Sequence, residues 1–351
     1  MALNTLEVAR DNARPADTQG LSPQPLPADL GAIFQRAALA DDLAAIEQLL
    51  MRRADSQAPL LAAAGAHTIA AGGKRLRAAL VLLAARLGDY DLERASHPAA
   101  AIELLHAASL VHDDLVDHTG RRRGHVTVHA RWDCSVALML GDYFFALSAN
   151  ELAAEPDPRI IRFYATAAQT IVEGELSPVT QLEPLEVALA QYHHKIGCKT
   201  AALFEAACKA GITVAGGTGP QIDALGRFGY NLGLAFQIVD DVLDFTGDER
   251  ALGKPAGNDL REGTWTLPLI YAVGEGSNAQ LRELARTLRP PSPDHALELL
   301  SAVIASGGVA RALEEAQATA ARALAQLADF PSSKTTRALA DICDFILSRQ
   351  T

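Results

Sequence analysis

Residues 106–117, HAASLVHDDLVD, decide the fold class of this chain of 351 residues. Their apolar side chains recur at steps of three and four, which is the period of an α-helix, and the stretch ends in DDLVD at 113–117. Residues 231–244, NLGLAFQIVDDVLD, repeat the arrangement and end in DDVLD at 240–244. Helices that are apolar on most sides lie inside a bundle. The two stretches predict an all-α protein with acidic motifs at the ends of two buried helices.

The rest of the chain has the same helical character. Alanine and leucine dominate, aromatic residues make up 5%, and alternating segments rich in Val, Ile and Thr are nearly absent. Glycine and proline are scattered, so no linker between domains is visible. We predict a single-domain bundle of about a dozen helices over residues 29–351. Residues 1–28 are polar and contain several prolines, and we expect them to form a flexible N-terminal arm.

Composition and charge exclude several classes of protein. The net charge of −11 argues against a nucleic-acid partner, which would require a basic surface. The four cysteines are far apart and form no CxxC pair, so a reducing cytoplasm fits. The first residues lack the apolar run of a signal peptide, and the longest strongly apolar run, 78–85, is too short to span a bilayer. We predict a cytoplasmic protein with no stable membrane anchor.

Each acidic motif has the spacing of a divalent-metal site. Helix positions i and i+4 share a face, which brings the first and last aspartates of a motif together, and the middle one lies about 100° around the axis. Carboxylate ligands favour Mg²⁺, with Mn²⁺ as a substitute. The alternative is a solvated acidic face, which two copies embedded in apolar residues make the weaker interpretation. The candidate ligands are Asp113, Asp114, Asp117, Asp240, Asp241 and Asp244.

Cationic segments accompany the acidic motifs. GGKRLR at 72–77 opens a helix, where glycines, a helix N-terminus and three cations form an anion site. RRR at 121–123 closely follows the first acidic motif, and guanidinium groups bind phosphate in a bidentate manner. Taken alone, the first segment is more often an ordinary basic helix start, and the second is equally an exposed loop. Lys199-Thr200 and Lys254 stand out only in combination with these segments.

Together these motifs resemble the trans-isoprenyl diphosphate synthases, also called polyprenyl synthetases. The similarity runs in good order from about residue 71 to 272 and more loosely to 349. Its specific segments are GGKRLR (72–77), HAASLVHDDLVDHTGRRRG (106–124), GDYFFA (141–146), KTAALF (199–204), and NLGLAFQIVDDVLDFTGD with LGKPAGNDLREGTWTLPLIYA (within 231–272). The resemblance implies an isoprenoid synthase fold around a central apolar cavity, a homodimer, and Mg²⁺-dependent condensation of isopentenyl diphosphate with an allylic diphosphate.

The resemblance also implies a role for each candidate residue. The six aspartates would ligate Mg²⁺, about three ions per active site, with Asp114 and Asp241 in support. The residues expected at the allylic diphosphate are Arg122, Lys199, Gln237 and Lys254, with Thr200 facing the reacting carbons. The residues expected at isopentenyl diphosphate are Lys74, Arg75, Arg77, His106 and Arg123. A lone histidine on an apolar helix is ordinarily a core side chain, but the position of His106, two turns before Asp113, favours a ligand.

Product length should follow from the residues that line the path of the growing tail. Side chains one turn before Asp113 point into that path, and they are the small Ala108 and Ser109. Short-product members of the family tend to carry an aromatic residue there. We therefore predict a product longer than geranylgeranyl diphosphate. Should deeper residues close the tunnel, the alternative is a farnesyl or geranylgeranyl diphosphate synthase.

Two rival functions differ in class. A class I terpene cyclase also uses a DDxxD motif, but it normally pairs that motif with an Asn-Ser/Thr-Glu motif and lacks the GGKRxR segment. A non-catalytic synthase subunit would be expected to lose carboxylates, whereas this chain keeps all six. Both rivals are weaker than the synthase interpretation.

Overall fold

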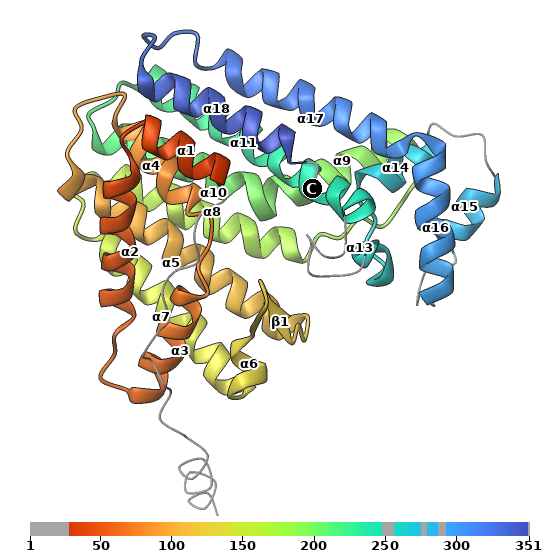
Figure 1. The fold of residues 1–351 in the computed structure, drawn as a ribbon, viewed down its shortest axis with the longest axis horizontal. Coiled ribbons are helices and arrows are strands. Elements are labelled where there is room, and N and C mark those ends of the chain that lie inside the picture. The colour runs from red at the N-terminus through yellow and green to blue at the C-terminus, as the bar shows by residue number, and fades with distance from the viewer. Residues whose placement is uncertain (1–27, 248–255, 275–278, 287–292, 350–351) are drawn as a thin grey trace, which may run out of the picture.

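The computed structural model describes residues 28–247, 256–274, 279–286 and 293–349 (Figure 1). These residues form helices and one short hairpin. In chain order the elements are α1 (Ala28–Arg36), α2 (Ala40–Ala54), α3 (Pro59–Ala70), α4 (Leu76–Ala85), α5 (Leu92–Val116), β1 (Arg121–Arg122), β2 (His125–Val126), α6 (Val128–Arg131), α7 (Cys134–Leu152), α8 (Pro158–Glu175), α9 (Leu185–Ile196), the π-helix η1 (Gly197–Ala201), α10 (Ala202–Val214), α11 (Gly219–Thr246), α13 (Asn258–Arg261), α14 (Leu267–Gly274), α15 (Ala279–Arg286), α16 (Pro293–Ser306), α17 (Gly308–Ala325) and α18 (Lys334–Ser348).

The predicted all-α class is confirmed. The described residues hold more than a dozen helices, because short ones such as α6 and α13, of four residues each, join the longer ones. Within the described ranges the sheet structure is a two-stranded antiparallel hairpin, in which Arg121 pairs with Val126 and Arg122 with His125. The hairpin follows α5 directly and carries the arginines that the sequence singled out.

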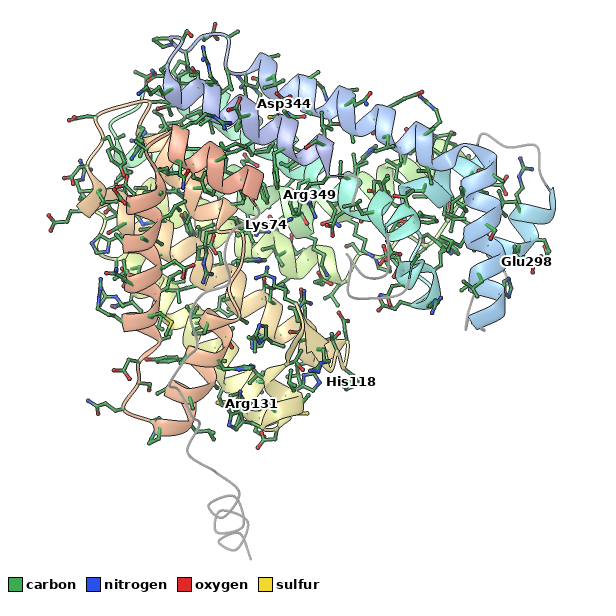
Figure 2. All side chains as sticks on the ribbon, viewed as in Figure 1. Lys74, His118, Arg131, Glu298, Asp344 and Arg349 are labelled. Atoms are coloured by element: carbon green, nitrogen blue, oxygen red, sulfur yellow. The ribbon has the colours of Figure 1, made fainter. Side chains whose placement is uncertain are left out.

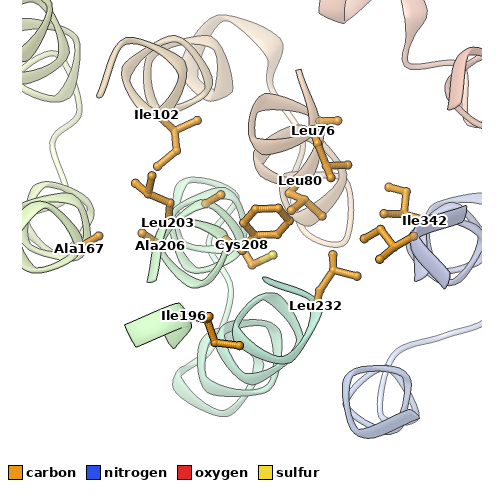
Figure 3. Close-up of a cluster of buried hydrophobic side chains, with 14 of the residues drawn as sticks. Leu76, Leu80, Ile102, Ala167, Ile196, Leu203, Ala206, Cys208, Leu232 and Ile342 are labelled. Atoms are coloured by element: carbon orange, nitrogen blue, oxygen red, sulfur yellow. The ribbon is translucent and has the colours of Figure 1, made fainter. Parts of the chain in front are cut away.

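The centre of the bundle is built around α4, in which every residue except Arg77 is buried. Helices α4 and α10 cross closely at Gly211, where a Cβ atom would lie 2.1 Å from the carbonyl oxygen of Val81, so only glycine fits. Apolar side chains from five helices meet in this core (Figure 3): Leu76 and Leu80 of α4, Ile102 of α5, Leu203 of α10, Leu232 of α11 and Ile342 of α18.

The two helices that carry the acidic motifs are long and largely buried. Helix α5 begins where the Asp91 side chain accepts a hydrogen bond from the Glu93 amide, and α11 begins at a capping box formed by Thr218 and Gln221. Both motifs lie at the C-terminal ends, as predicted. The negative end of each helix dipole therefore adds to the carboxylate charge, so both helix ends favour cations.

Two further predictions meet the limits of the described residues. Nearly all of the predicted N-terminal arm, residues 1–27, lies outside them, as does Lys254.

In the part of the chain that is described, no single helix is both long and apolar enough to cross a membrane. Among the described helices, one pair, His295–Ser306 and Gly308–Ala325, meets those criteria of length and composition jointly, and it is bent by 63°.

Candidate active site

The first acidic motif is held by two cations from other elements. Arg122 of the hairpin donates from Nε to Asp114 Oδ1 at 2.7 Å, and Lys199 Nζ lies 3.8 Å from Asp113 Oδ2. Burial raises the pKa of both carboxyls, although Lys199 opposes the rise at Asp113 and Arg122 opposes it at Asp114. Carboxylates with raised pKa values at a helix C-terminus are under-compensated, which favours the binding of a further cation.

The second motif divides its three aspartates among different partners. Asp240, half exposed, lies 3.2 Å from Nη2 of Arg349 at the end of α18. Asp241 is buried and accepts hydrogen bonds from Tyr192 at 2.7 Å and Gln237 at 2.8 Å. Asp244, also buried, accepts one from the Asp259 amide at 2.9 Å. Asp240 is therefore the most accessible carboxylate of this motif.

A π-helical turn joins the two motifs. In η1 the consecutive residues Lys199 and Thr200 point to different motifs. Lys199 reaches Asp113 of the first, and Thr200 donates at 2.6 Å to Gln237, which in turn donates to Asp241 of the second. Single π-turns inside α-helices are frequent at functional sites because they reset the direction of side chains. Since two adjacent residues reach both motifs, the motifs face the same short segment.

Lys199 is charged and locally paired. Its Nζ lies 2.7 Å from Glu175 Oε1 at the end of α8. Burial would lower the pKa of Lys199, but Asp113 and Glu175 outweigh burial and raise it. The ammonium group therefore stays protonated beside the first motif, where a diphosphate would need a positive charge.

A second group of cations lies beside the motifs, on a pair of phenylalanine rings. The rings of Phe204 and Phe236 are 5.6 Å apart. The guanidinium carbon of Arg77 lies 5.0 Å from the Phe204 ring centre, and Arg349 and Lys74 lie 4.9 and 5.9 Å from that of Phe236. Figure 2 shows Lys74 and Arg349 close together. The cluster comes from the start of α4 and the loop before it, from α10 and α11, and from the C-terminal end of α18.

Among the described residues, the three cations of this cluster have one carboxylate ion-pair partner, Asp240, which contacts Arg349. Burial, followed by the positive charge of Arg349, lowers the pKa of Lys74 to about 8, and burial lowers that of Arg77 to about 10. Within the described part of the chain, Nε of Arg77 and Nη1 of Arg349 are buried and have no hydrogen-bond partner. Buried donors without acceptors are costly, so this group is complementary to an anion with several oxygens.

Arg123 and His106 complete the cationic cluster. Arg123, at a positive φ of 50°, donates to the carbonyl of Gly72, and a Cβ atom on Gly73 would lie 2.7 Å from its Nη1. The hairpin arginine thus closes against the glycine loop, which explains the second glycine. Burial, and then the charges of Arg77 and Arg123, lower the pKa of His106 well below its usual value. His106 is therefore neutral at physiological pH.

A model of the polyprenyl synthetase family matches residues 58–304. The chain belongs to the polyprenyl synthetase family. It is 45% identical to heptaprenyl diphosphate synthase component 2 of Geobacillus stearothermophilus over 68% of this chain and 74% of that protein, and 35% identical to octaprenyl diphosphate synthase of Haemophilus influenzae over 82% and 90%. A Caulobacter crescentus polyprenyl synthase complexed with calcium and isoprenyl diphosphate matches with a TM-score of 0.85 and 35% identity, over 94% of this chain and all of that one.

Membership of the polyprenyl synthetase family makes the protein a divalent-metal-dependent trans-prenyltransferase. The residues present fit such a metal, because six carboxylates stand at two helix ends and Asp113 and Asp114 have raised pKa values. Among the described residues, however, no three His, Cys, Asp or Glu side chains already converge into a cage. Protein cations hold the carboxylates of Asp113, Asp114 and Asp240 instead.

The structure separates Arg75 from the other predicted substrate-binding residues. Arg75 has a left-handed backbone, with φ of 47°, which turns its side chain into the core. Its guanidinium lies 2.5 Å from Glu47 and 3.4 Å from Glu103 and donates to the Ile69 carbonyl at 3.1 Å. Both carboxylates raise the pKa of Arg75, against the effect of burial. The side chain therefore stabilises the glycine loop, a different position from the one expected.

Sequence reasoning missed four residues of this site. Arg349 contacts Asp240, Tyr192 contacts Asp241, and Glu175 contacts Lys199. Glu103 of α5 is buried and accepts a hydrogen bond at 3.1 Å from the amide of Ala78, at the start of α4. The signal for Glu103 was a charged residue inside an apolar helix, which requires a buried partner.

The predicted chain-length residues lie on helix α5 and are buried to different degrees. Ala108 is fully buried, and the half-buried Ser109 donates to the carbonyl of His106 at 2.9 Å. Of the deeper residues, Phe144 is fully buried, and the ring of Phe145 lies 5.9 Å from that of His112. Phe145 therefore packs against the helix of the first motif, close to the predicted path of the tail.

Proposed function

We propose that this protein is a long-chain polyprenyl diphosphate synthase, which adds isopentenyl diphosphate repeatedly to an allylic diphosphate and yields a product longer than geranylgeranyl diphosphate. The single observation that carries the proposal is the π-turn at Lys199 and Thr200, which ties both aspartate motifs to one point. A reaction centre between two metal-binding motifs requires that proximity. The relatives named heptaprenyl and octaprenyl diphosphate synthase support the product class.

The allylic diphosphate would bind between the two motifs. Mg²⁺, held by Asp113 and Asp117 and by Asp240 and Asp244, with Asp114 and Asp241 in support, would neutralise the charge of the departing diphosphate when bound. We propose Mg²⁺ as the natural ion, about three per site, because hard carboxylate ligands favour it. Arg122 and Lys199 would offset the same charge from the protein side, together with Lys254.

Isopentenyl diphosphate would bind at the cations Lys74, Arg77 and Arg123 and the neutral His106, with its double bond directed at the allylic carbon. The allylic C–O bond then breaks and releases pyrophosphate, the double bond of isopentenyl diphosphate forms the new C–C bond to the resulting cation, and the released pyrophosphate takes up the proton whose loss restores a double bond. Thr200 and Gln237 would orient the reacting end of the allylic chain. The apolar surroundings of α5 and α11 exclude water, which would otherwise quench the cation.

Assembly and location belong to the proposal as well. We propose a homodimer in the cytoplasm, made by a catalytic domain over residues 29–351 behind the N-terminal arm. The relative named component 2 of a heptaprenyl diphosphate synthase makes a second subunit the alternative. Light scattering measures the molar mass of the purified chain, alone and after co-purification from its host. A mass of two chains indicates a homodimer, and a second, different chain in the complex indicates a two-subunit enzyme.

The reaction is tested with purified protein, isopentenyl diphosphate and Mg²⁺, using geranyl, farnesyl or geranylgeranyl diphosphate as primer. Mass spectrometry of the products should show chains longer than geranylgeranyl, and chelation of the metal should abolish them. Asp113→Asn serves as the matched inactive variant, since it keeps the shape of the side chain. Cyclic hydrocarbons would favour a cyclase instead. No product from any primer would reject the proposal.

A further inference from the structure

Tyr192 on α9 makes a buried contact with the middle aspartate of the second motif. Its side chain is 1% exposed, and its hydroxyl donates a hydrogen bond of 2.7 Å to Asp241 Oδ2. Gln237 Nε2 donates to the other oxygen, Oδ1, at 2.8 Å. Both oxygens of Asp241 therefore have a protein donor. This aspartate is the one that lies about 100° from Asp240 around the helix axis, which turns it toward α9.

The contact continues as a line of hydrogen bonds into the site. The amide nitrogen of Gln237 donates to Asp241. Its amide oxygen therefore points away from Asp241 and accepts a hydrogen bond of 2.6 Å from Thr200 Oγ1. Each member of the line fixes the orientation of the next. Tyr192 stands at the outer end of the line and Thr200 at the inner end, beside Lys199.

Helix α9 is itself anchored next to Tyr192. The neighbouring residue His193 lies 2.6 Å from Glu315 Oε1 of α17, and Tyr271 of α14 donates to the other oxygen of Glu315. These contacts fix α9 against two further helices at the position from which Tyr192 reaches Asp241. The hydroxyl is therefore presented from a rigid element, as a group that orients a metal site must be.

We propose that Tyr192 is a positioning residue for the second aspartate motif: it holds Asp241 against α9, so that Asp240 stays directed at the site for metal and Gln237 and Thr200 keep their orientation. The inference rests on the proposed function, because it assumes that the second motif binds metal and diphosphate. It assigns Asp241 to anchoring the motif and leaves Asp240 as the accessible ligand. Removal of the hydroxyl would leave one buried carboxylate oxygen without a donor.

The chain contains a matched control in Tyr164. This tyrosine on α8 is also 1% exposed, and its hydroxyl donates at 2.6 Å to the carbonyl of Pro98. Tyr192→Phe and Tyr164→Phe thus remove the same atom from equally buried positions, each with one short hydrogen bond. A purely structural effect appears in both variants, whereas an effect on the motif appears only in the first.

The experiment measures the Mg²⁺ concentration that half-saturates binding of inorganic pyrophosphate, by calorimetry without turnover, together with KM values for both substrates. Tyr192→Phe should raise the Mg²⁺ requirement roughly tenfold, as loss of a residue that orients a metal ligand does. It should also raise KM for the allylic substrate and leave KM for isopentenyl diphosphate within about twofold, because the hydrogen-bonded line ends at Thr200. Tyr164→Phe should change none of the three. Equal Mg²⁺ requirements in the two variants would overturn the proposal.

A double-mutant cycle protects the test against loss of folding. With Asp241→Asn as background, Tyr192→Phe should add little to the Mg²⁺ requirement, because the partner that it orients is already altered. Tyr164→Phe on the same background should be additive, and full additivity for Tyr192→Phe would contradict the proposal. If the wild-type chain made no prenyl product but Tyr192→Phe still shifted Mg²⁺-dependent pyrophosphate binding, the proposed function would fail while the role of Tyr192 stood.

Discussion

Nη2 of Arg349, the last residue that the structure describes, lies 3.2 Å from Oδ1 of Asp240 in the second aspartate motif. The two residues are 109 positions apart in the sequence. The guanidinium also stacks 4.9 Å from the ring centre of Phe236, and its charge lowers the pKa of Lys74. The end of α18 therefore places a cation between the candidate metal site and the candidate isopentenyl diphosphate site.

Arg349→Ala should weaken diphosphate binding. The change removes a guanidinium whose Nη1 is buried and has no hydrogen-bond partner among the described residues, and to which a diphosphate would offer charge-assisted hydrogen bonds. We expect KM for isopentenyl diphosphate to rise about tenfold, which corresponds to about 1.4 kcal/mol of lost binding. Arg337→Ala, on the exposed face of the same helix, is the control and should leave KM unchanged. Equal KM values in the two variants would show that Arg349 serves only Asp240.

Isopentenyl diphosphate binding should weaken as the pH rises through about 8. The pKa of Lys74 is lowered to about 8 by burial and by the charge of Arg349, so the amine is charged below that pH and neutral above it. A neutral amine loses the attraction for diphosphate, and KM should rise on the alkaline side. Lys74→Arg should flatten this alkaline rise, because arginine stays protonated there. Arg349→Ala should shift the rise of KM to higher pH, because the charge of Arg349 lowers the pKa of Lys74. A rise that persists unchanged in Lys74→Arg would show that another group titrates there.

Glu103 should affect both the stability of the fold and the binding of isopentenyl diphosphate, although it belongs to neither aspartate motif. Arg75 begins α4 with no side-chain cap of its own, and Glu103 accepts the hydrogen bond of the Ala78 amide in that helix's first turn. The same carboxylate pairs with Arg75, and its charge opposes the effect of burial on the pKa of Arg77 and Arg123. Its loss therefore leaves the Ala78 amide without that acceptor and removes one of the two carboxylates that pair with Arg75.

Glu103→Ala should lower the free energy of unfolding by about 3 kcal/mol, which is typical when one partner of a buried ion pair is removed. Glu103→Gln keeps an oxygen for the Ala78 amide and should lose less stability, while KM for isopentenyl diphosphate still changes because Lys74 lies in the loop before α4 and Arg77 in its first turn. Glu47→Gln is the control, since Glu47 contacts Arg75 but not the start of α4. Denaturant unfolding and steady-state kinetics check both parts, and a Glu103→Gln variant as stable and as active as Glu47→Gln would argue against the role.

The sequence predicted the features that depend on local pattern. The all-α class and the position of both motifs at the ends of α5 and α11 follow from helical spacing and are confirmed. The orientation of Arg75 did not follow, because a left-handed backbone at one residue reverses a side chain without changing the sequence pattern. Tyr192 and Arg349 reach the second motif from 49 and 109 residues away, and one sequence carries no signal for such packing.

Ala108→Phe should shorten the product. Ala108 is fully buried on α5, about one turn before Asp113, so a phenyl ring there would project into the core beside the predicted path of the tail. We expect the main product to fall to geranylgeranyl diphosphate or shorter while the rate of the first condensation stays within about threefold, because the aspartates keep their positions. Ala107→Phe, on the adjacent helix position, is the control for general overpacking, which typically costs about 1–3 kcal/mol in either variant. Mass spectrometry measures the product lengths. An unchanged length in Ala108→Phe would indicate that deeper residues such as Phe144 limit the product instead. Equal shortening in both variants would indicate a general distortion of α5.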